Sequence, residues 1–82
     1  MKIGVYSLDK VLYQGEAREV NCRTKIGEIT ILQNHEPIIS ILDRGTMKIV
    51  DNEAKEHYIP VSSGFLEFKQ NEGRFLVEEE RA

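Results

Sequence analysis

Apolar and polar residues alternate with period two along nearly the whole chain. Ile3 and Val5 alternate with Lys2 and Gly4 near the start, and short runs rich in Val, Ile, Tyr and Phe recur up to Val77. Such alternation is typical of strands that bury one face, whereas an amphipathic helix repeats its apolar residues every three or four positions. The pattern therefore predicts an all-β fold.

Turn-forming residues separate the apolar runs at roughly 8- to 12-residue intervals, a spacing typical of an all-β sandwich or barrel. We therefore predict about eight to ten short strands. The predicted turns are Leu8-Asp9-Lys10, Gln14-Gly15, Lys25-Ile26-Gly27, Asp43-Arg44-Gly45, Asp51-Asn52-Glu53, Ser62-Ser63-Gly64 and Asn71-Glu72-Gly73. The residues predicted to be largely buried are Ile3, Val5, Val20, Ile29, Ile31, Ile49, Ile59 and Phe75.

Two stretches depart from simple alternation. Pro60 lies inside the run "HYIPVS" and cannot donate a hydrogen bond to a neighbouring strand. That strand is therefore expected to be an edge strand at Pro60 or to carry a bulge. The final stretch "VEEERA" is too short for an isolated helix, so Glu78-Glu79-Glu80 is expected to form a solvated tail.

Length and composition exclude several classes of protein. A chain of 82 residues forms one small domain, 1–82, and its 40% hydrophobic and 30% charged residues are typical of a soluble globular protein. The net charge is −3 and the basic residues are scattered, so no nucleic-acid partner is expected. Cys22 has no cysteine to pair with, and the start of the chain lacks an apolar secretory segment, so we expect a reducing cytoplasm.

The candidates for metal or catalytic chemistry are few. A metal site would draw on Cys22, His35, Glu36 and His57, but these residues lack the paired spacing of zinc ligands. The chain contains no G-x-S-x-G elbow, no phosphate-binding loop and no H-E-x-x-H motif. We therefore expect no enzymatic activity, no metal and no cofactor. A small metalloenzyme built on His35 and His57 is the catalytic alternative.

One polar corner stands between two apolar runs. Within "GEITILQNHEPIISIL", residues 27–42, the segment Asn34-His35-Glu36-Pro37 must turn the chain. Ile29 and Ile31 alternate with polar residues before the corner, whereas the run "IISIL" after it leaves hardly any polar face. In a chain without a catalytic constellation, such a corner is more typical of a contact surface than of a reaction centre.

This stretch resembles the signature "G-E-L-G-I-L-P-G-H-A-P-L-L-T-A-L" of the epsilon subunits of F-type ATP synthases. The resemblance extends along nearly the whole chain. "VLYQGEAREV" is similar to "V-L-F-E-G-E-V-D-E-V", "LDRGTMKIV" to "L-K-P-G-V-V-R-I", and "EHYIPVSSGFLEF" to "E-E-Y-I-A-V-S-G-G-F-L-E-V". Gln33-Asn34 replaces the Pro-Gly of the signature, and Asn tolerates the left-handed backbone that such a turn requires.

The resemblance implies a β-sandwich of two roughly five-stranded sheets. It also implies a non-catalytic rotor subunit of the central stalk, which links the gamma subunit to the ring of c subunits and couples ion translocation to ATP synthesis. The implied location is peripheral, on the cytoplasmic face of the bacterial cell membrane, and the isolated domain is expected to be a monomer. Most members of the family continue into two carboxy-terminal helices that can inhibit ATP hydrolysis. This sequence stops where those helices would start, so the helical domain is expected to be absent, through either a naturally short subunit or a trimmed chain.

The resemblance also implies contact residues for each partner. The residues that match gamma-facing positions are Ser7, His35 and Ser40, with Ser40 in place of the usual Thr. The residues that match the turn facing the c ring are Thr24, Lys25, Ile26, Gly27 and Glu28. The alternative from a different functional class is an unrelated β-sandwich that binds a peptide or a carbohydrate, which would need an exposed aromatic platform.

Overall fold

The computed structural model describes residues 1–80 and is built from strands alone. Its seven strands are β1 (Lys2–Tyr6), β2 (Val11–Thr24), β3 (Gly27–Leu32), β4 (Ile38–Leu42), β5 (Gly45–Asp51), β6 (Glu56–Lys69) and β7 (Glu72–Glu79). Arg81 and Ala82, the end of the predicted acidic tail, lie outside the described residues. Among residues 1–80 there is no helix of the length and hydropathy that crossing a membrane requires. The predicted all-β fold class is confirmed.

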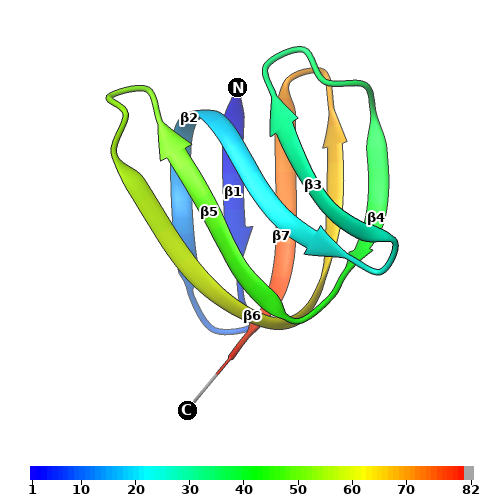
Figure 1. The fold of residues 1–82 in the computed structure, drawn as a ribbon. Helices are drawn as coiled ribbons and strands as arrows, with labels where there is room; N and C mark the ends of the chain where they lie inside the picture. Colours follow the sequence, from blue (N-terminus) through cyan, green and yellow to red (C-terminus); the bar gives the residue numbers. More distant parts are fainter. Residues whose placement is uncertain (81–82) are drawn as a thin grey trace.

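Two long strands connect two layers into a sandwich (Figure 1). One layer, here called the four-segment layer, contains β3, the second half of β2, β5 and the first half of β6. The five-segment layer contains the first half of β2, then β1, β7, the second half of β6, and β4. The predicted number of eight to ten strands is wrong: the described residues form seven, because β2 and β6 are long and each contributes to both layers. The two layers agree with the β-sandwich that the resemblance implies.

The strand boundaries differ from the prediction at two of the expected turns. Gln14-Gly15 lies inside β2, and Ser62-Ser63-Gly64 lies inside β6. Near these points the pairing slips, between Ala17 and Glu19 in β2 and between Val61 and Ser63 in β6. Strands that pass from one sheet to another do so through bulges or bends. The turn-forming residues therefore mark bends between layers, and not reversals of the chain.

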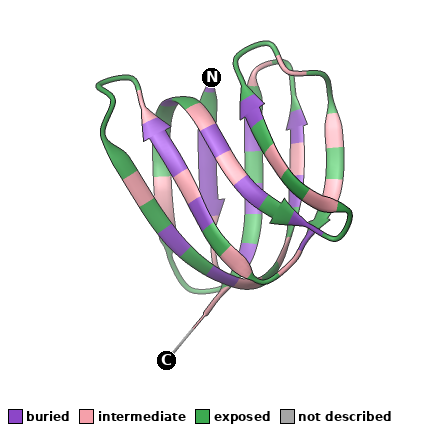
Figure 2. Ribbon diagram, in the orientation of Figure 1, coloured by how far each residue is buried: buried purple, intermediate pink, exposed green. Residues whose placement is uncertain are grey.

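The core lies between the layers, as the alternation of buried and exposed residues along each strand shows (Figure 2). Seven of the eight residues predicted to be largely buried are buried. The prediction is wrong for Ile29, which packs against the core but remains half-buried because β3 is paired on one side only, with β2. The most deeply buried large side chains include Phe68 and Phe75, from neighbouring strands of the five-segment layer.

The structure confirms the expected behaviour of Pro60. The first half of β6 pairs with β5 alone, so Pro60 lies on an edge, and the bulge at Val61 and Ser63 follows directly. Its carbonyl accepts a hydrogen bond from the backbone N–H of Glu80 at 2.9 Å. The predicted solvated tail is wrong in part, because Glu79 continues β7 and forms an ion pair with Lys10 at 3.5 Å.

Candidate functional site

The turn between β2 and β3 projects from the sandwich on a rigid base. Thr24 is 2% exposed, and its hydroxyl donates to the carbonyl of Gly27 at 2.8 Å. The same oxygen accepts from the backbone N–H of Ile26 at 3.3 Å. Gly27 has a φ of 129°, and no atom lies within 4 Å of where a Cβ would stand. Thr24 thus closes the turn from inside, while the neighbouring residues face solvent.

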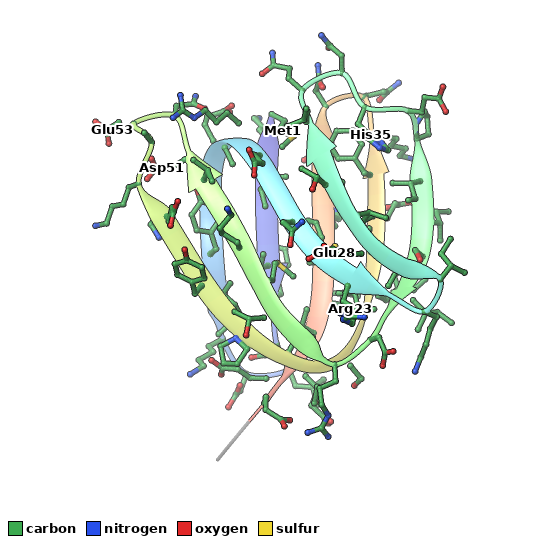
Figure 3. All side chains as sticks on the ribbon, in the orientation of Figure 1. Met1, Arg23, Glu28, His35, Asp51 and Glu53 are labelled. Atoms are coloured by element: carbon green, nitrogen blue, oxygen red, sulfur yellow. The ribbon has the colours of Figure 1, made fainter. Side chains whose placement is uncertain are left out.

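The solvent side of this turn combines one large apolar residue with charges. Ile26 is 90% exposed at the tip. Lys25 forms an ion pair with Asp43 at 3.2 Å, and the N–H of Arg44 together with Lys25 holds the pKa of Asp43 below its ordinary value. Glu28, the second residue of β3, pairs with Arg23 of β2 (Figure 3). An exposed apolar tip flanked by charges is a surface suited to contact with another polar loop.

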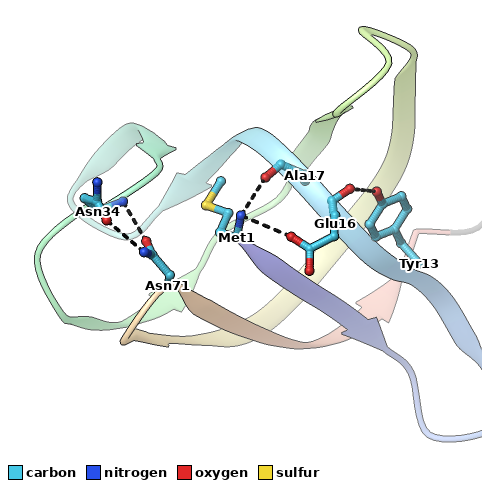
Figure 4. A network of polar contacts seen from close by, with 6 residues as sticks. All are labelled: Met1, Tyr13, Glu16, Ala17, Asn34 and Asn71. Carbon is cyan, nitrogen blue, oxygen red and sulfur yellow. Dashed lines mark hydrogen bonds and ion pairs between the residues drawn. The ribbon is translucent and has the colours of Figure 1, made fainter.

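The corner between β3 and β4, residues 33–37, is fixed by a reciprocal pair of asparagines (Figure 4). The N–H of Asn34 donates to Oδ1 of Asn71 at 2.6 Å, and Nδ2 of Asn71 donates to Oδ1 of Asn34 at 2.8 Å. Asn34 has a φ of 66°, as expected from its place in the signature. These bonds tie the corner to the turn between β6 and β7, so His35 is presented from a rigid position.

His35 is half-buried at this corner and is held from two sides. Its Nδ1 lies 2.8 Å from the carbonyl of Glu36, and its ring meets Phe68 edge-on with 6.1 Å between centroids. Ser40 follows in β4 opposite Leu66, which is buried, so its side chain points toward the core side of the layer. His35 and Ser40 thus lie on the same margin of the sandwich.

Ser7 lies apart from these two residues. The corner containing His35 is bonded to Asn71, whose carbonyl accepts from the N–H of Lys2, at the start of β1 and β7. Ser7 follows the end of β1, where its hydroxyl donates to Asp9 at 3.0 Å. Because β1 and β7 are parallel, Ser7 and His35 lie at opposite ends of these strands. The structure therefore does not bring the three residues matched to gamma-facing positions into one patch.

The residues considered for a metal site do not come together. His57 lies near the start of β6, whereas His35 contacts Phe68 near its end. Cys22 is buried, and burial raises its pKa to about 11, so its thiol stays protonated at neutral pH. Within residues 1–80, no group of three or more His, Cys, Asp and Glu side chains is placed to hold a metal ion.

His57 belongs instead to the turn between β5 and β6. Its Nε2 lies 3.0 Å from Oδ2 of Asp51, and its ring meets Tyr13 at 5.0 Å between centroids. Oδ1 of Asp51 accepts from the N–H groups of Glu53 and Lys55, each at 2.9 Å. The hydrogen bond from His57, with those from Lys55 and Glu53, holds the pKa of Asp51 below its ordinary value. This cluster closes a hairpin turn.

The aromatic residues do not form a platform for stacking a sugar. Phe68 and Phe75 are buried, and the most exposed aromatic side chains are Tyr58, at 59%, and Phe65, at 43%. Tyr58 pairs across β5 in the four-segment layer, whereas Phe65 pairs across β4 and β7 in the five-segment layer. The two aromatic side chains therefore face different surroundings, which disfavours the carbohydrate-binding alternative.

A set of exposed apolar residues on the five-segment layer was missed by sequence reasoning. Besides Phe65, it includes Leu76, Ile39 and Ile41, each more than half exposed. Alternation with period two could not predict that these side chains face solvent, because the neighbouring positions on these strands are apolar too. The signal that could have identified them is the lack of a polar face in "IISIL".

Comparisons with known proteins match this sandwich to one family. The family model described as "ATP synthase, Delta/Epsilon chain, beta-sandwich domain" matches residues 1–80. The ATP synthase epsilon chain of Clostridium kluyveri is 36% identical over 78 residues, and that of Dichelobacter nodosus is 30% identical over 78 residues. Each match covers 95% of this chain but only 59% and 54% of the respective relative. The chain thus spans little more than half the length of these relatives.

Two solved structures share the fold at low sequence identity. A chain of the Euglena gracilis mitochondrial ATP synthase, in a structure of OSCP, F1 and the c-ring, superposes with a TM-score of 0.85 at 19% identity. That match covers 92% of this chain and 48% of the Euglena chain. A chain from the central stalk and c-ring of the Tetrahymena thermophila mitochondrial ATP synthase gives a TM-score of 0.79 at 14% identity, covering 96% and 63%.

Proposed function

Because this chain belongs to the family of ATP synthase delta/epsilon chains through its β-sandwich domain, we propose that it is a non-catalytic rotor subunit of an F-type ATP synthase. In this role it links the gamma subunit to the c ring and couples ion translocation to ATP synthesis. It would lie peripherally on the cytoplasmic face of the bacterial cell membrane. The observation that carries the proposal is the family match over residues 1–80, since fold likeness alone does not specify function.

The contact with the c ring is assigned to the turn between β2 and β3. Lys25, Ile26, Gly27 and Glu28 form its solvent side, while Thr24 supports the turn from within. The exposed Ile26 and the carboxylate of Glu28 would meet the polar loops of the ring. A charge at the rim of an interface mainly affects the association rate and its dependence on salt.

The contact with gamma is assigned to the margin that carries His35 and Ser40, with Ser7 as a separate point of contact. Glu28 lies at the start of β3 and His35 follows the end of that strand, which supports two distinct contact regions. His35 is held by Glu36 and Phe68, so little side-chain freedom would be lost when it is covered. Its removal is expected to speed dissociation from gamma.

Two variants compared side by side test the division into two contact regions. We expect Glu28→Lys to impair coupled ATP synthesis while leaving gamma binding nearly unchanged. His35→Ala should weaken gamma binding by about 1–2 kcal/mol, because only a few interface positions exceed that range. The measurements are the Kd for purified gamma and ion-driven ATP synthesis in reconstituted vesicles.

Matched control variants distinguish the loss of a specific contact from the general effect of changing a charge or removing a large side chain. Glu53→Lys makes the same charge change at the exposed hairpin between β5 and β6, and Tyr58→Ala removes an exposed ring from the four-segment layer. Both controls should leave binding and synthesis unchanged. If Glu28→Lys weakens gamma binding as much as His35→Ala does, the assignment of separate regions is wrong.

A further inference from the structure

Each layer of the sandwich has two edge strands, and three of these four edges carry an obstacle to pairing with a further strand. The first half of β6 is one edge of the four-segment layer. Pro60 has no N–H to offer there, and its carbonyl already accepts from the N–H of Glu80 at 2.9 Å. Because a proline on an edge strand removes a donor, it protects that edge from pairing with another chain.

The two edges of the five-segment layer are interrupted as well. In the first half of β2, Gly15 has a φ of 155°, and the carbonyl of Glu16 accepts from the hydroxyl of Tyr13 at 2.9 Å. On β4, the carbonyl of Ile41 accepts from the N–H of Lys25 at 3.0 Å, so this edge is already partly occupied. Neither edge therefore offers an unbroken row of backbone groups.

The remaining edge, formed by β3, is unbroken. It pairs with β2 over six positions, from Gly27 to Leu32, without a shift of register. Within residues 1–80 no strand other than β2 pairs with it, and Figure 1 shows it at the border of the four-segment layer. The strand contains no proline and is about 17 Å long. Half of its N–H and C=O groups therefore point away from β2 and are available to another strand.

Both ends of β3 are held in place by the sandwich itself. At the start, the hydroxyl of Thr24 donates to the carbonyl of Gly27 at 2.8 Å. At the end, the N–H of His35 donates to the carbonyl of Leu32 at 3.1 Å, within the corner that Asn34 ties to the turn before β7. A strand fixed at both ends loses little conformational freedom on binding, so the edge is preorganised.

The side chains of β3 specify what an added strand has to carry. Ile29 packs against the core but is only half-buried, because no strand covers its open flank. An apolar residue on the inner face of an added strand would cover it. On the outer face, Leu32 and Glu28 are exposed, and Glu28 forms no ion pair among residues 1–80. Apolar and basic residues beside them would complement this face.

From these observations we propose that the open edge of β3 binds an extended segment of another protein, which joins the four-segment layer as an antiparallel strand. Strand addition is a recurrent mode of peptide recognition, in which main-chain hydrogen bonds provide affinity and side chains provide specificity. The outer face of the segment carries, from its amino end, an apolar residue beside Leu32, a polar one beside Thr30, and Lys or Arg beside Glu28. The residues between them are apolar and face the core.

This inference goes beyond the contacts proposed above. It concerns the backbone edge of β3, whereas those contacts use the turn before this strand and the corner after it. It does not rest on the rotor role either, because strand addition is measured as peptide binding to the isolated chain. Failure of that binding would leave the coupling of ion translocation to ATP synthesis untouched.

A designed peptide, acetyl-Thr-Leu-Val-Thr-Val-Lys-Thr-amide, provides the probe. It is titrated into the ¹⁵N-labelled chain while amide chemical shifts and hydrogen exchange are recorded. We expect shift changes along β3 and slower exchange at its alternate amides, with β4 and the first half of β6 unchanged. The same peptide with Glu in place of Lys should bind about tenfold more weakly, since it places a like charge beside Glu28.

Methylation of the peptide backbone distinguishes strand pairing from adhesion through side chains. In an antiparallel ladder the amides of alternate residues face the same neighbour. One peptide is therefore N-methylated at its two Val residues, and a second at Leu, the central Thr and Lys. One of the two should bind about tenfold more weakly, because its hydrogen bonds to β3 are lost, and the other should bind as the parent peptide does. Equal affinities of the two would overturn the proposal.

Variants of two half-buried edge residues provide the matched comparison. Ile29→Lys places a charge on the inner face of the edge, which is how natural edge strands avoid pairing, and should raise the Kd at least about tenfold. Ile38→Lys makes the same change on β4, an edge strand of the other layer, and should leave the Kd unchanged. Ile29→Thr, which retains the preference for strands, should raise the Kd about threefold. Thermal melts show whether each variant is folded, and Ile29→Thr maintains the test if Ile29→Lys is not.

Two further results would overturn the proposal. Slower exchange in β4 or in the first half of β6, with β3 unchanged, would place the peptide on another edge. Protection of the β3 amides that increases with protein concentration in the absence of peptide would show that a second copy of this chain covers the edge.

Discussion

The two outer faces of the sandwich carry different chemistry on similar strands. On the four-segment layer, Asn21 donates to Thr30 at 2.9 Å, and Lys48 lies 4.0 Å from Glu19. On the five-segment layer, the apolar side chains of Tyr6, Leu76 and Phe65 occupy the corresponding outward positions. Both layers bury their inner faces in one shared core. The difference between the faces therefore does not arise from the needs of the core.

The comparison indicates which of the two outer faces is better suited to contact with a partner. An antiparallel sheet with one face toward water normally alternates apolar inward and polar outward residues, as the four-segment layer does except at Leu32 and Tyr58. Contiguous exposed apolar surface is uncommon on isolated domains and marks contact with a partner. The five-segment layer therefore carries the larger exposed apolar surface of the two.

The largest expected effect contrasts two neighbouring residues of β6 in the five-segment layer. Leu66→Ala should lower the free energy of unfolding by about 3 kcal/mol, because it leaves a cavity at a fully buried position. Phe65→Ala should cost about half as much, ~1.5 kcal/mol, since this side chain faces outward and 43% of it is already exposed. Urea denaturation measures both. Similar losses would show that the side chain of Phe65 contributes to stability as a core residue does.

A smaller effect is expected at the asparagine pair that joins the corner of residues 33–37 to the turn before β7. Asn34→Ala should lower the free energy of unfolding by about 1 kcal/mol more than Asn34→Gly, because only glycine adopts a positive φ without cost. Both variants lose the hydrogen bond from Asn71, so their difference isolates the backbone. Equal stabilities would show that the corner changes its conformation freely.

Acid should weaken the four-segment layer through Asp51. Its pKa is held below the ordinary value of 3.8, first by the hydrogen bond from His57, so the ionised form stabilises the folded state. That contribution is complete above about pH 4 and is lost as the pH falls through the lowered pKa. Thermal melts between pH 2 and 6 should show a shallower acid decline for Asp51→Asn. Parallel profiles would exclude a role for this carboxylate.

The smallest effect is expected on the polar face itself. Glu19→Gln should change the free energy of unfolding by less than about 0.5 kcal/mol, because Lys48 and Glu19 form a long, solvent-screened ion pair. The measurement is urea denaturation at low and high salt. A loss above about 1 kcal/mol would mean that the polar face contributes to stability as the core does.

The sequence predicted the fold class well because period two reports burial directly. It predicted Asn34 in a left-handed turn and Pro60 on an edge for a different reason, since the backbone that each of these residues tolerates is a property of the residue itself. The prediction of a turn at Ser62-Ser63-Gly64 failed, because the same residue types occur in chain-reversing turns and in bends between layers. Only long-range strand pairing distinguishes the two.

The alternation of apolar and polar residues could not predict which side chains lie on the outer face of the five-segment layer. Phe65 and Leu66 are adjacent and both apolar, so alternation does not say which of them faces the core. The separation of Ser7 from His35 could not be predicted from the sequence either, because it depends on the parallel pairing of β1 with β7, which are far apart in the chain. Contact residues matched one at a time carry no information on whether they share a patch.

The most direct test of the account is ATP synthesis by the complete complex with and without this chain. Vesicles carrying the ATP synthase of the same organism, stripped of this subunit, are driven by an ion gradient, and ATP formation is followed before and after the purified chain is added back. The account predicts that synthesis is low without the chain and returns when it is added, while Glu28→Lys restores less. Equal synthesis with and without the chain would contradict its role as a coupling subunit of the rotor.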